Sequence, residues 1–148
     1  MSINDNMVSV ALVSPKTHHN VGSAVRACEM FKAKSLMYTG RRYKPAGTDT
    51  MKSVNSVPTM RVDDVFDSIP FGSIPIAVDR IEGAVPLHSY KHPKNAFYIF
   101  GPEDGTLGKK IHSRCKDVVY IPMDGCLNLA ATVNVVLYDR VSKELRND

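Results

Sequence analysis

Short apolar runs alternate along this chain with polar segments that contain glycine or proline. Several of these runs have the length and the branched or aromatic side chains that are typical of buried β-strands. The predicted strands span residues 8–13, 35–38, 74–78, 96–100 and 118–122, and residues 84–87 are a shorter candidate.

Three segments are predicted as helices. The first covers residues 21–32, with Asn20 as its expected N-cap, and the others cover residues 107–115 and 127–145. Residues 61–69 are a candidate short helix, because two aspartates suit its first turn. Strands that alternate with helices predict an α/β fold, mainly a parallel sheet with flanking helices.

Residues 40–59 contain two glycines and two prolines and have little periodicity. We expect a long, partly ordered loop there, and such loops are usually functional or disordered. The chain has 148 residues and no internal repeat or linker, so a single domain, residues 1–148, is expected.

The absence of targeting signals and the cysteine pattern indicate where in the cell the protein is expected. No apolar stretch is long enough to span a bilayer, and residues 1–7 are too polar for a secretory signal. Cys28, Cys115 and Cys126 lack metal-binding or redox spacing, and their odd number fits a reducing compartment. We therefore expect a cytoplasmic protein with no metal site.

Charge is unevenly distributed. The formal net charge is +4, with eight Lys/Arg against three Asp/Glu in residues 1–59 and eleven against twelve in residues 60–148. This basic excess favours a polyanionic partner, with nucleic acid the leading candidate. A solvated basic surface is the alternative.

Three motifs carry candidate chemistry. In the first, Asn20-Val-Gly-Ser-Ala-Val-Arg26, Gly22 and Arg26 share a helix face. The arginine is expected to lean over the glycine toward the helix start, which would form an anion site. A glycine near a helix start followed by a surface arginine is the alternative.

The second motif, Gly101-Pro-Glu-Asp-Gly105, follows the strand predicted at residues 96–100. Proline ends the strand and Gly105 is expected to allow a tight backbone before the next helix. Glu103 is thereby held at a strand-to-helix turn, where ligands bind in open α/β sheets. An acidic turn that caps a helix is the alternative.

The third motif, at residues 121–130, places Cys126 and Asn128 near the start of the last helix. A helix start could activate a nucleophilic thiolate. No histidine is placed by sequence to serve Cys126, so packing or a cofactor contact is favoured for it.

Together the three motifs resemble the SpoU, or TrmH-like, branch of the SPOUT RNA 2′-O-methyltransferases, over nearly the whole chain. The size is closest to the small TrmL-like members that methylate the wobble ribose of tRNA. The resemblance implies an α/β fold with a C-terminal trefoil knot, a homodimer, S-adenosyl-L-methionine as cofactor and RNA, most of all tRNA, as substrate.

By motif, the resemblance implies catalytic roles for four residues and cofactor contacts for seven. The catalytic set is Asn20, Arg26, Glu103 and Asn128. The cofactor set is Val78, Phe100, Gly101, Ile121, Met123, Cys126 and Leu127. The chain departs from the family pattern at Ser23, at residues 104–106, at Cys126 and at Ala130.

The implied reaction is attack of a ribose 2′-hydroxyl on the cofactor's methyl group, which requires alignment and charge stabilisation. Arginine is almost always protonated, so Arg26 is favoured as a cation beside the oxygen; solvent or a perturbed Arg26 could accept the proton. Glu103 is expected to orient Asn20 or Arg26 by hydrogen bonding. Asn128 is expected to fix the loop around the cofactor, which precedes the last helix. An RNA-binding protein without catalysis, and a nucleotide-binding Rossmann-like domain, are the alternatives.

Two surfaces are expected to bind macromolecules. Arg41, Arg42 and Lys44 could grip RNA phosphates, with a solvated loop as the alternative. Apolar residues cover most of the circumference of residues 127–137, so that helix is expected at a dimer interface. Burial under the chain's own 40–59 loop is the alternative.

Overall fold

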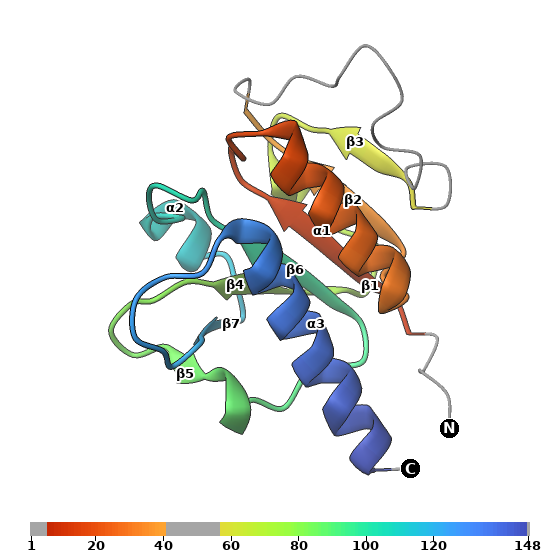
Figure 1. Ribbon diagram of the computed structural model, residues 1–148, viewed down its shortest axis with the longest axis vertical. Helices are drawn as coiled ribbons and strands as arrows, with labels where there is room; N and C mark the ends of the chain where they lie inside the picture. Colours follow the sequence, from red (N-terminus) through yellow and green to blue (C-terminus); the bar gives the residue numbers. More distant parts are fainter. Residues whose placement is uncertain (1–5, 41–56, 148) are drawn as a thin grey trace.

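The computed structural model describes residues 6–40 and 57–147. A single seven-stranded sheet runs through the molecule in the order β3-β2-β1-β6-β4-β7-β5, and every pairing is parallel (Figure 1). Its strands are β1 (Val8–Leu12), β2 (Ser35–Tyr38), β3 (Thr59–Arg61), β4 (Ile74–Val78), β5 (Val85–Pro86), β6 (Ala96–Phe100) and β7 (Asp117–Tyr120).

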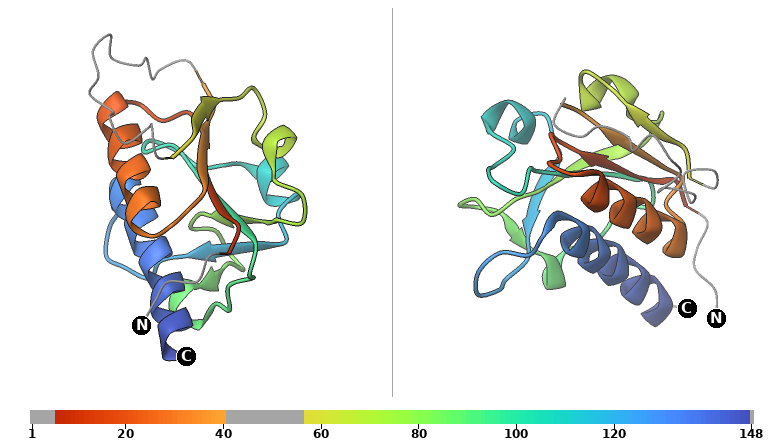
Figure 2. Two further views of the ribbon diagram at one scale, coloured as in Figure 1. Left: turned by 90° about the vertical axis from the view of Figure 1, so that its right-hand side faces the viewer. Right: turned by 45° about the horizontal axis from the view of Figure 1, so that its top comes forward.

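The centre of the sheet is buried on both faces. Every residue of β1 and β6 is buried, as a parallel sheet with two covered faces requires. Helices α1 (His18–Met30) and α3 (Leu129–Arg146) lie side by side on one face (Figure 2). The 3₁₀ helix η2 (Val65–Ser68) and the short α2 (Lys109–His112) contribute Val65, Phe66 and Ile111 to the apolar cluster on the other face.

Buried polar contacts fix α3 to the chain before β6. Arg140, only 4% exposed, donates to the carbonyl oxygens of Pro93 and Lys94 and to the Tyr98 hydroxyl. His92 Nε2 lies 2.7 Å from Asp139 Oδ2, and His92 Nδ1 lies 2.7 Å from the Tyr98 hydroxyl. Burial lowers the pKa of His92 to about 4, against the opposing effect of Asp139, so the ring is neutral at pH 7. These contacts hold the helix whose first turn lies at the candidate site.

The predicted α/β class and parallel sheet are confirmed, with strands at residues 35–38, 74–78 and 96–100 as expected. Strand β3 begins at Thr59, the last residue of the segment expected to be a loop, and residues 41–56 of that segment lie outside the described residues. The helix predicted at residues 107–115 is wrong in length, because only α2 forms there. Within the described residues, no helix is both long and apolar enough to cross a membrane.

Candidate functional site

The carboxyl ends of four neighbouring strands, β1, β6, β4 and β7, open onto one edge of the sheet. The register aligns Leu12 and Val78 with Phe100, the last residue of β6. The loops that follow these strands therefore meet beside one another, which is where ligands bind in open α/β sheets. All three sequence motifs lie at this edge.

The first two motifs are in direct contact. The side-chain amide of Asn20, in the first turn of α1, donates to Glu103 Oε2 at 2.5 Å. The backbone N–H of Lys16 lies 3.3 Å from both oxygens of the same carboxylate. Glu103 thus lies at the N-terminal end of α1, where the helix dipole favours negative charge. The contact expected between Glu103 and Asn20 is present.

The expected N-cap of the first helix was wrong. Thr17 is the cap, and its hydroxyl accepts the backbone N–H of Asn20 at 3.1 Å. Helix α1 therefore begins at His18, before the predicted start. Because the Thr17 hydroxyl caps the helix, the Asn20 side chain does not serve as the cap and donates to Glu103 instead.

Arg26 lies further along α1, with its side chain exposed. Its guanidinium makes no hydrogen bond or ion pair with any other residue that the structure describes. Glu103 therefore contacts Asn20, and Arg26 has no ion pair with Glu103.

Two glycines shape the loop after β6. A Cβ on Gly101 would lie 3.3 Å from Leu107 Cγ, so the loop folds closely onto itself there. Gly108 has φ +84°, a conformation that favours glycine, and α2 begins directly after it. The tight backbone expected at Gly105 is present, because the Gly105 N–H donates to the Pro102 carbonyl oxygen at 3.3 Å and closes a turn. The turn does not depend on glycine, since Gly105 has no positive φ and a Cβ there would make ordinary contact.

Asp79, the residue after β4, joins this loop to the neighbouring strand. Its Oδ2 accepts the Thr106 hydroxyl at 2.6 Å, the Leu107 N–H at 3.0 Å and His112 Nε2 at 2.8 Å. Burial acts to raise the pKa of Asp79, but these hydrogen bonds and the His112 charge outweigh it and lower the pKa. The carboxylate is therefore ionised at neutral pH.

A small cavity of about 90 Å³ lies between the ends of β4 and β7. Arg80 Nη2 closes one side by donating to the Met123 carbonyl oxygen at 2.6 Å. Three of the seven predicted cofactor residues, Val78, Ile121 and Met123, line this cavity. The other lining residues are Asp79, Arg80, Tyr120 and Thr132. Phe100 and Gly101 lie at the same edge outside the lining, and Cys126 and Leu127 are exposed in the loop after β7.

The loop after β7 offers unpaired backbone groups. No backbone N–H in residues 121–127 donates to another residue of the described chain. Asn128 ends the loop as the N-cap of α3, and its Oδ1 accepts the Ala131 N–H at 2.7 Å. Asn128 therefore fixes the junction between loop and helix, and the loop can present its amides to a ligand.

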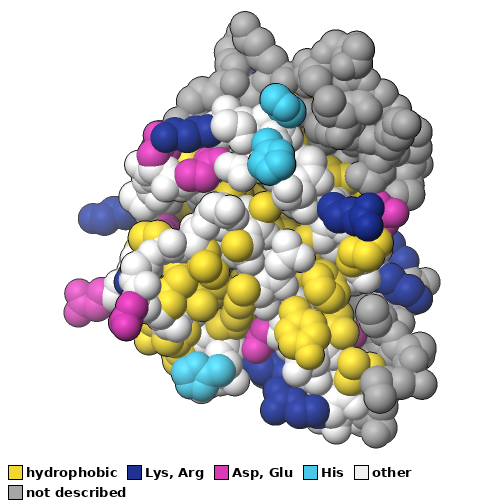
Figure 3. All heavy atoms as spheres, in the orientation of Figure 1, with side chains coloured by type: hydrophobic (Ala, Val, Ile, Leu, Met, Phe, Trp, Pro, Cys, Tyr) yellow, Lys and Arg dark blue, Asp and Glu magenta, His cyan; other side chains and the backbone are white. Residues whose placement is uncertain are grey.

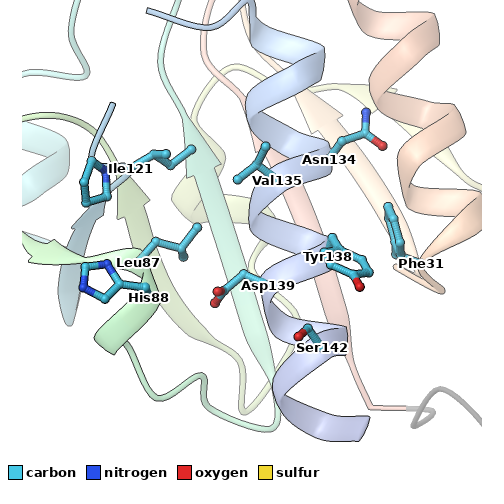
Figure 4. A pocket seen from close by; sticks show the side chains of 10 residues that line it. Phe31, Leu87, His88, Ile121, Asn134, Val135, Tyr138, Asp139 and Ser142 are labelled. Carbon is cyan, nitrogen blue, oxygen red and sulfur yellow. The ribbon is translucent and has the colours of Figure 1, made fainter. Parts of the chain in front are cut away.

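A larger groove of about 550 Å³ runs along the outer side of α3 (Figure 4). Val135 and Tyr138 expose 37% and 59% of their surface, and the Tyr138 ring lies 6.1 Å from that of Phe31. Hydrophobic side chains gather over this face of the molecule (Figure 3). Ile121 lines both this groove and the small cavity.

Some site residues were missed by sequence reasoning. Asp79 follows a predicted strand, a position that could have marked it. Thr106 and His112 gave no signal, because they meet Asp79 only in the fold. The expected RNA contacts Arg41, Arg42 and Lys44 lie outside the described residues. No group of three or more potential metal ligands occurs among residues 6–40 and 57–147.

A parallel α/β sheet with its polar motifs at one carboxyl edge defines a ligand-binding class of protein, and sequence comparison makes the class specific. The chain belongs to the SpoU rRNA Methylase family, which residues 7–138 match.

Two relatives are each 24% identical to this chain. One is the 23S rRNA (guanosine-2′-O-)-methyltransferase RlmB of Acinetobacter baylyi, where the match covers 96% of this chain and 62% of the relative. The other is a putative tRNA (cytidine(34)-2′-O)-methyltransferase of Lactococcus lactis, with 93% and 90% covered.

The crystal structure of the SpoU methyltransferase AviRb from Streptomyces viridochromogenes, in complex with AdoMet, superposes with a TM-score of 0.83. Its sequence is 21% identical, and the match covers 97% of this chain and 60% of AviRb. The chain thus has the SpoU methyltransferase fold, and it spans about three fifths of the length of AviRb and of the Acinetobacter relative.

Proposed function

We propose that this protein is an S-adenosyl-L-methionine-dependent RNA ribose 2′-O-methyltransferase, with tRNA as the favoured substrate. The observation that carries the proposal is the Asn20–Glu103 pair, which lies at the same sheet edge as the cavity. Asn20 is on α1, the helix that also carries the exposed side chain of Arg26. Family membership supports the reaction class. The Lactococcus relative, of which the match covers 90%, supports the choice of tRNA.

The residues at the cavity fit the proposed cofactor. Val78, Ile121 and Met123 offer apolar faces to a base. The backbone N–H groups of residues 121 and 123–127, which donate to no residue that the structure describes, offer donors to its edge. A cavity of about 90 Å³ holds part of such a ligand, with the rest against Gly101, Cys126 and Leu127. Bound there, the cofactor supplies a methyl group that is already activated for transfer.

The chain's own residues position and stabilise the substrate. Arg26 is assigned the role of a cation that holds the phosphate next to the reacting ribose and stabilises negative charge on the ribose oxygen. Asn20 is assigned to the substrate side of the site, in an orientation set by Glu103. Asn128 holds the end of the cofactor loop through its cap of α3.

The groove along α3 is assigned to a second copy of this chain. Its exposed Val135 and Tyr138 form an apolar face that two-fold pairing would cover. The groove also reaches Ile121, so a partner subunit would contact the cofactor loop. The same proposal has three further parts. The chain is one cytoplasmic domain, and the segment between β7 and α3 takes part in a trefoil knot. Arg41, Arg42 and Lys44 contact RNA.

The test is methyl transfer by the purified protein. The protein is incubated with methyl-labelled cofactor and separate pools of tRNA and rRNA, and labelled nucleotides are mapped for ribose methylation. Label on a tRNA ribose supports the proposal, and label only on rRNA redirects the substrate. Cofactor binding by calorimetry without transfer to any RNA would favour the non-catalytic alternative.

A further inference from the structure

We propose that Asp79 is a positioning residue, which clamps the loop after β6 to β4 and thereby holds Glu103 in place for the reaction. The inference rests on the proposed function for its effect on turnover. Its structural part stands on the contacts of Asp79, Thr106, Leu107 and His112 alone.

The Asp79 carboxylate makes four hydrogen bonds within the described protein. Oδ2 accepts three donors, and Oδ1 accepts the backbone N–H of Arg80 at 3.0 Å. An ionised carboxylate has about four acceptor sites. Although Asp79 lines the cavity, three of these four hydrogen bonds go to the loop after β6 and to α2, which indicates a role in holding the loop.

The clamp acts on the segment that carries Glu103. One end of this segment is held where Glu103 meets Asn20 and Lys16, and the other where Thr106 and Leu107 meet Asp79. Within this segment the Gly105 N–H also donates to the Pro102 carbonyl oxygen at 3.3 Å, and the exposed Asp104 pairs with Lys16 at 3.5 Å. Loss of the second attachment removes the contacts that tie this segment to β4, so Glu103 can shift relative to α1.

His112 completes the clamp from the following helix. Its side chain and that of Asp79 are each only 13% exposed, and their contact fixes α2 against the end of β4. Thr106 lies in the altered part of the second motif, so the departure from the family pattern supplies a hydroxyl that Asp79 binds. The altered motif is in this way attached to the neighbouring strand.

Thr106 gives the cleanest test, because its side chain is exposed and its replacement leaves the core intact. Thr106→Val keeps the shape and removes the hydroxyl, whereas Thr106→Ser keeps the hydroxyl. Ser113→Ala is the matched control, since its hydroxyl donates to the Lys110 carbonyl oxygen near the loop. Each variant is compared in kcat, in KM for tRNA, and in amide hydrogen exchange across residues 101–107 of the cofactor-free protein.

We expect Thr106→Val to lower kcat about tenfold with KM for tRNA unchanged within about twofold, and to speed exchange in residues 101–107. Thr106→Ser and Ser113→Ala should match the wild type. Unchanged exchange in Thr106→Val, or equal effects of the Val and Ser variants, would overturn the clamp. If the wild type transfers no methyl group, the proposed function fails, and the exchange measurement still decides whether the clamp exists.

Discussion

Asn20 and Glu103, which are 83 residues apart in the chain, are joined by a hydrogen bond of 2.5 Å between α1 and the loop after β6. The bond brings the first and second motifs into one unit. Glu103 also accepts the Lys16 N–H, so the start of α1 is held on one carboxylate.

Glu103→Gln should lower kcat about tenfold to a hundredfold and leave cofactor affinity within about twofold. The amide loses the charge that fixes Asn20 and also presents a donor toward it. Methyl transfer and cofactor calorimetry measure the two effects separately. Asp104→Asn is the control, because that exposed side chain pairs with Lys16 at 3.5 Å and should tolerate the change. Equal activities of the two variants would remove Glu103 from the mechanism.

Arg26→Ala should lower methyl transfer about a hundredfold or more, because the proposed oxyanion loses its cation. Arg26→Lys should restore little, since the planar fork is lost. Cofactor affinity and melting temperature should be unchanged, because Arg26 contacts no described side chain by hydrogen bond or ion pair. Arg146→Ala, an exposed arginine in the last turn of α3, is the charge-matched control. Near-normal turnover in Arg26→Ala would contradict the assignment.

His92 should make the protein less stable as the pH falls from about 6.5 to about 4. The native pKa is about 4 and an unfolded histidine has about 6.5, so within this window the unfolded state binds the extra proton. The contribution is complete above the window and is lost as the pH falls through it, on the order of 3 kcal/mol. The nearby groups Asp139, Lys143 and Arg140 oppose one another and do not reverse this direction.

The measurement is the free energy of unfolding in urea at several pH values between 4 and 7. His92→Gln should flatten the pH dependence, whereas the exposed His88→Gln should retain it. Asp79 does not act in this window. Its pKa is lowered, so its contribution is present above the unfolded value of about 3.9 and is lost only at lower pH. An unchanged slope in His92→Gln would assign the acid sensitivity to another group.

Tyr138→Glu should convert the proposed dimer to a monomer, because it places a charge in the apolar groove. Light scattering at micromolar concentration measures the mass. Met60→Glu is the control, since Met60 is 48% exposed on the edge strand β3 and does not line the groove. A wild-type protein that is monomeric and fully active would contradict the interface and its contact with the cofactor loop.

Elements whose pattern is set by burial were predicted well from the sequence. Strand β6 is buried at every position, and its apolar run marks its bounds without help from distant residues. Helix ends were predicted less well. Thr17 and Asn20 are both good N-cap residues, and only the fold shows that Thr17 caps the helix while Asn20 pairs with Glu103.

The candidate site divides in the same way. Asn20 and Glu103 were recognised from their motifs, and the fold joins them. The contacts of Asp79 could not be predicted, because Thr106 and His112 reach it from a different strand-to-helix connection. No regular helix begins at Leu107, because Gly108 follows with φ +84° and α2 begins only after it.

Ile121 lines both the cavity at the sheet edge and the groove along α3. One side chain is thereby shared by the proposed cofactor and the proposed partner subunit. Binding at two sites that share a group is reciprocal, so any gain in cofactor affinity on pairing equals the gain in pairing affinity on cofactor binding. If pairing raises cofactor affinity, the apparent cofactor dissociation constant depends on protein concentration. Dilution below the dimer dissociation constant would then raise that constant, as a competitive inhibitor would.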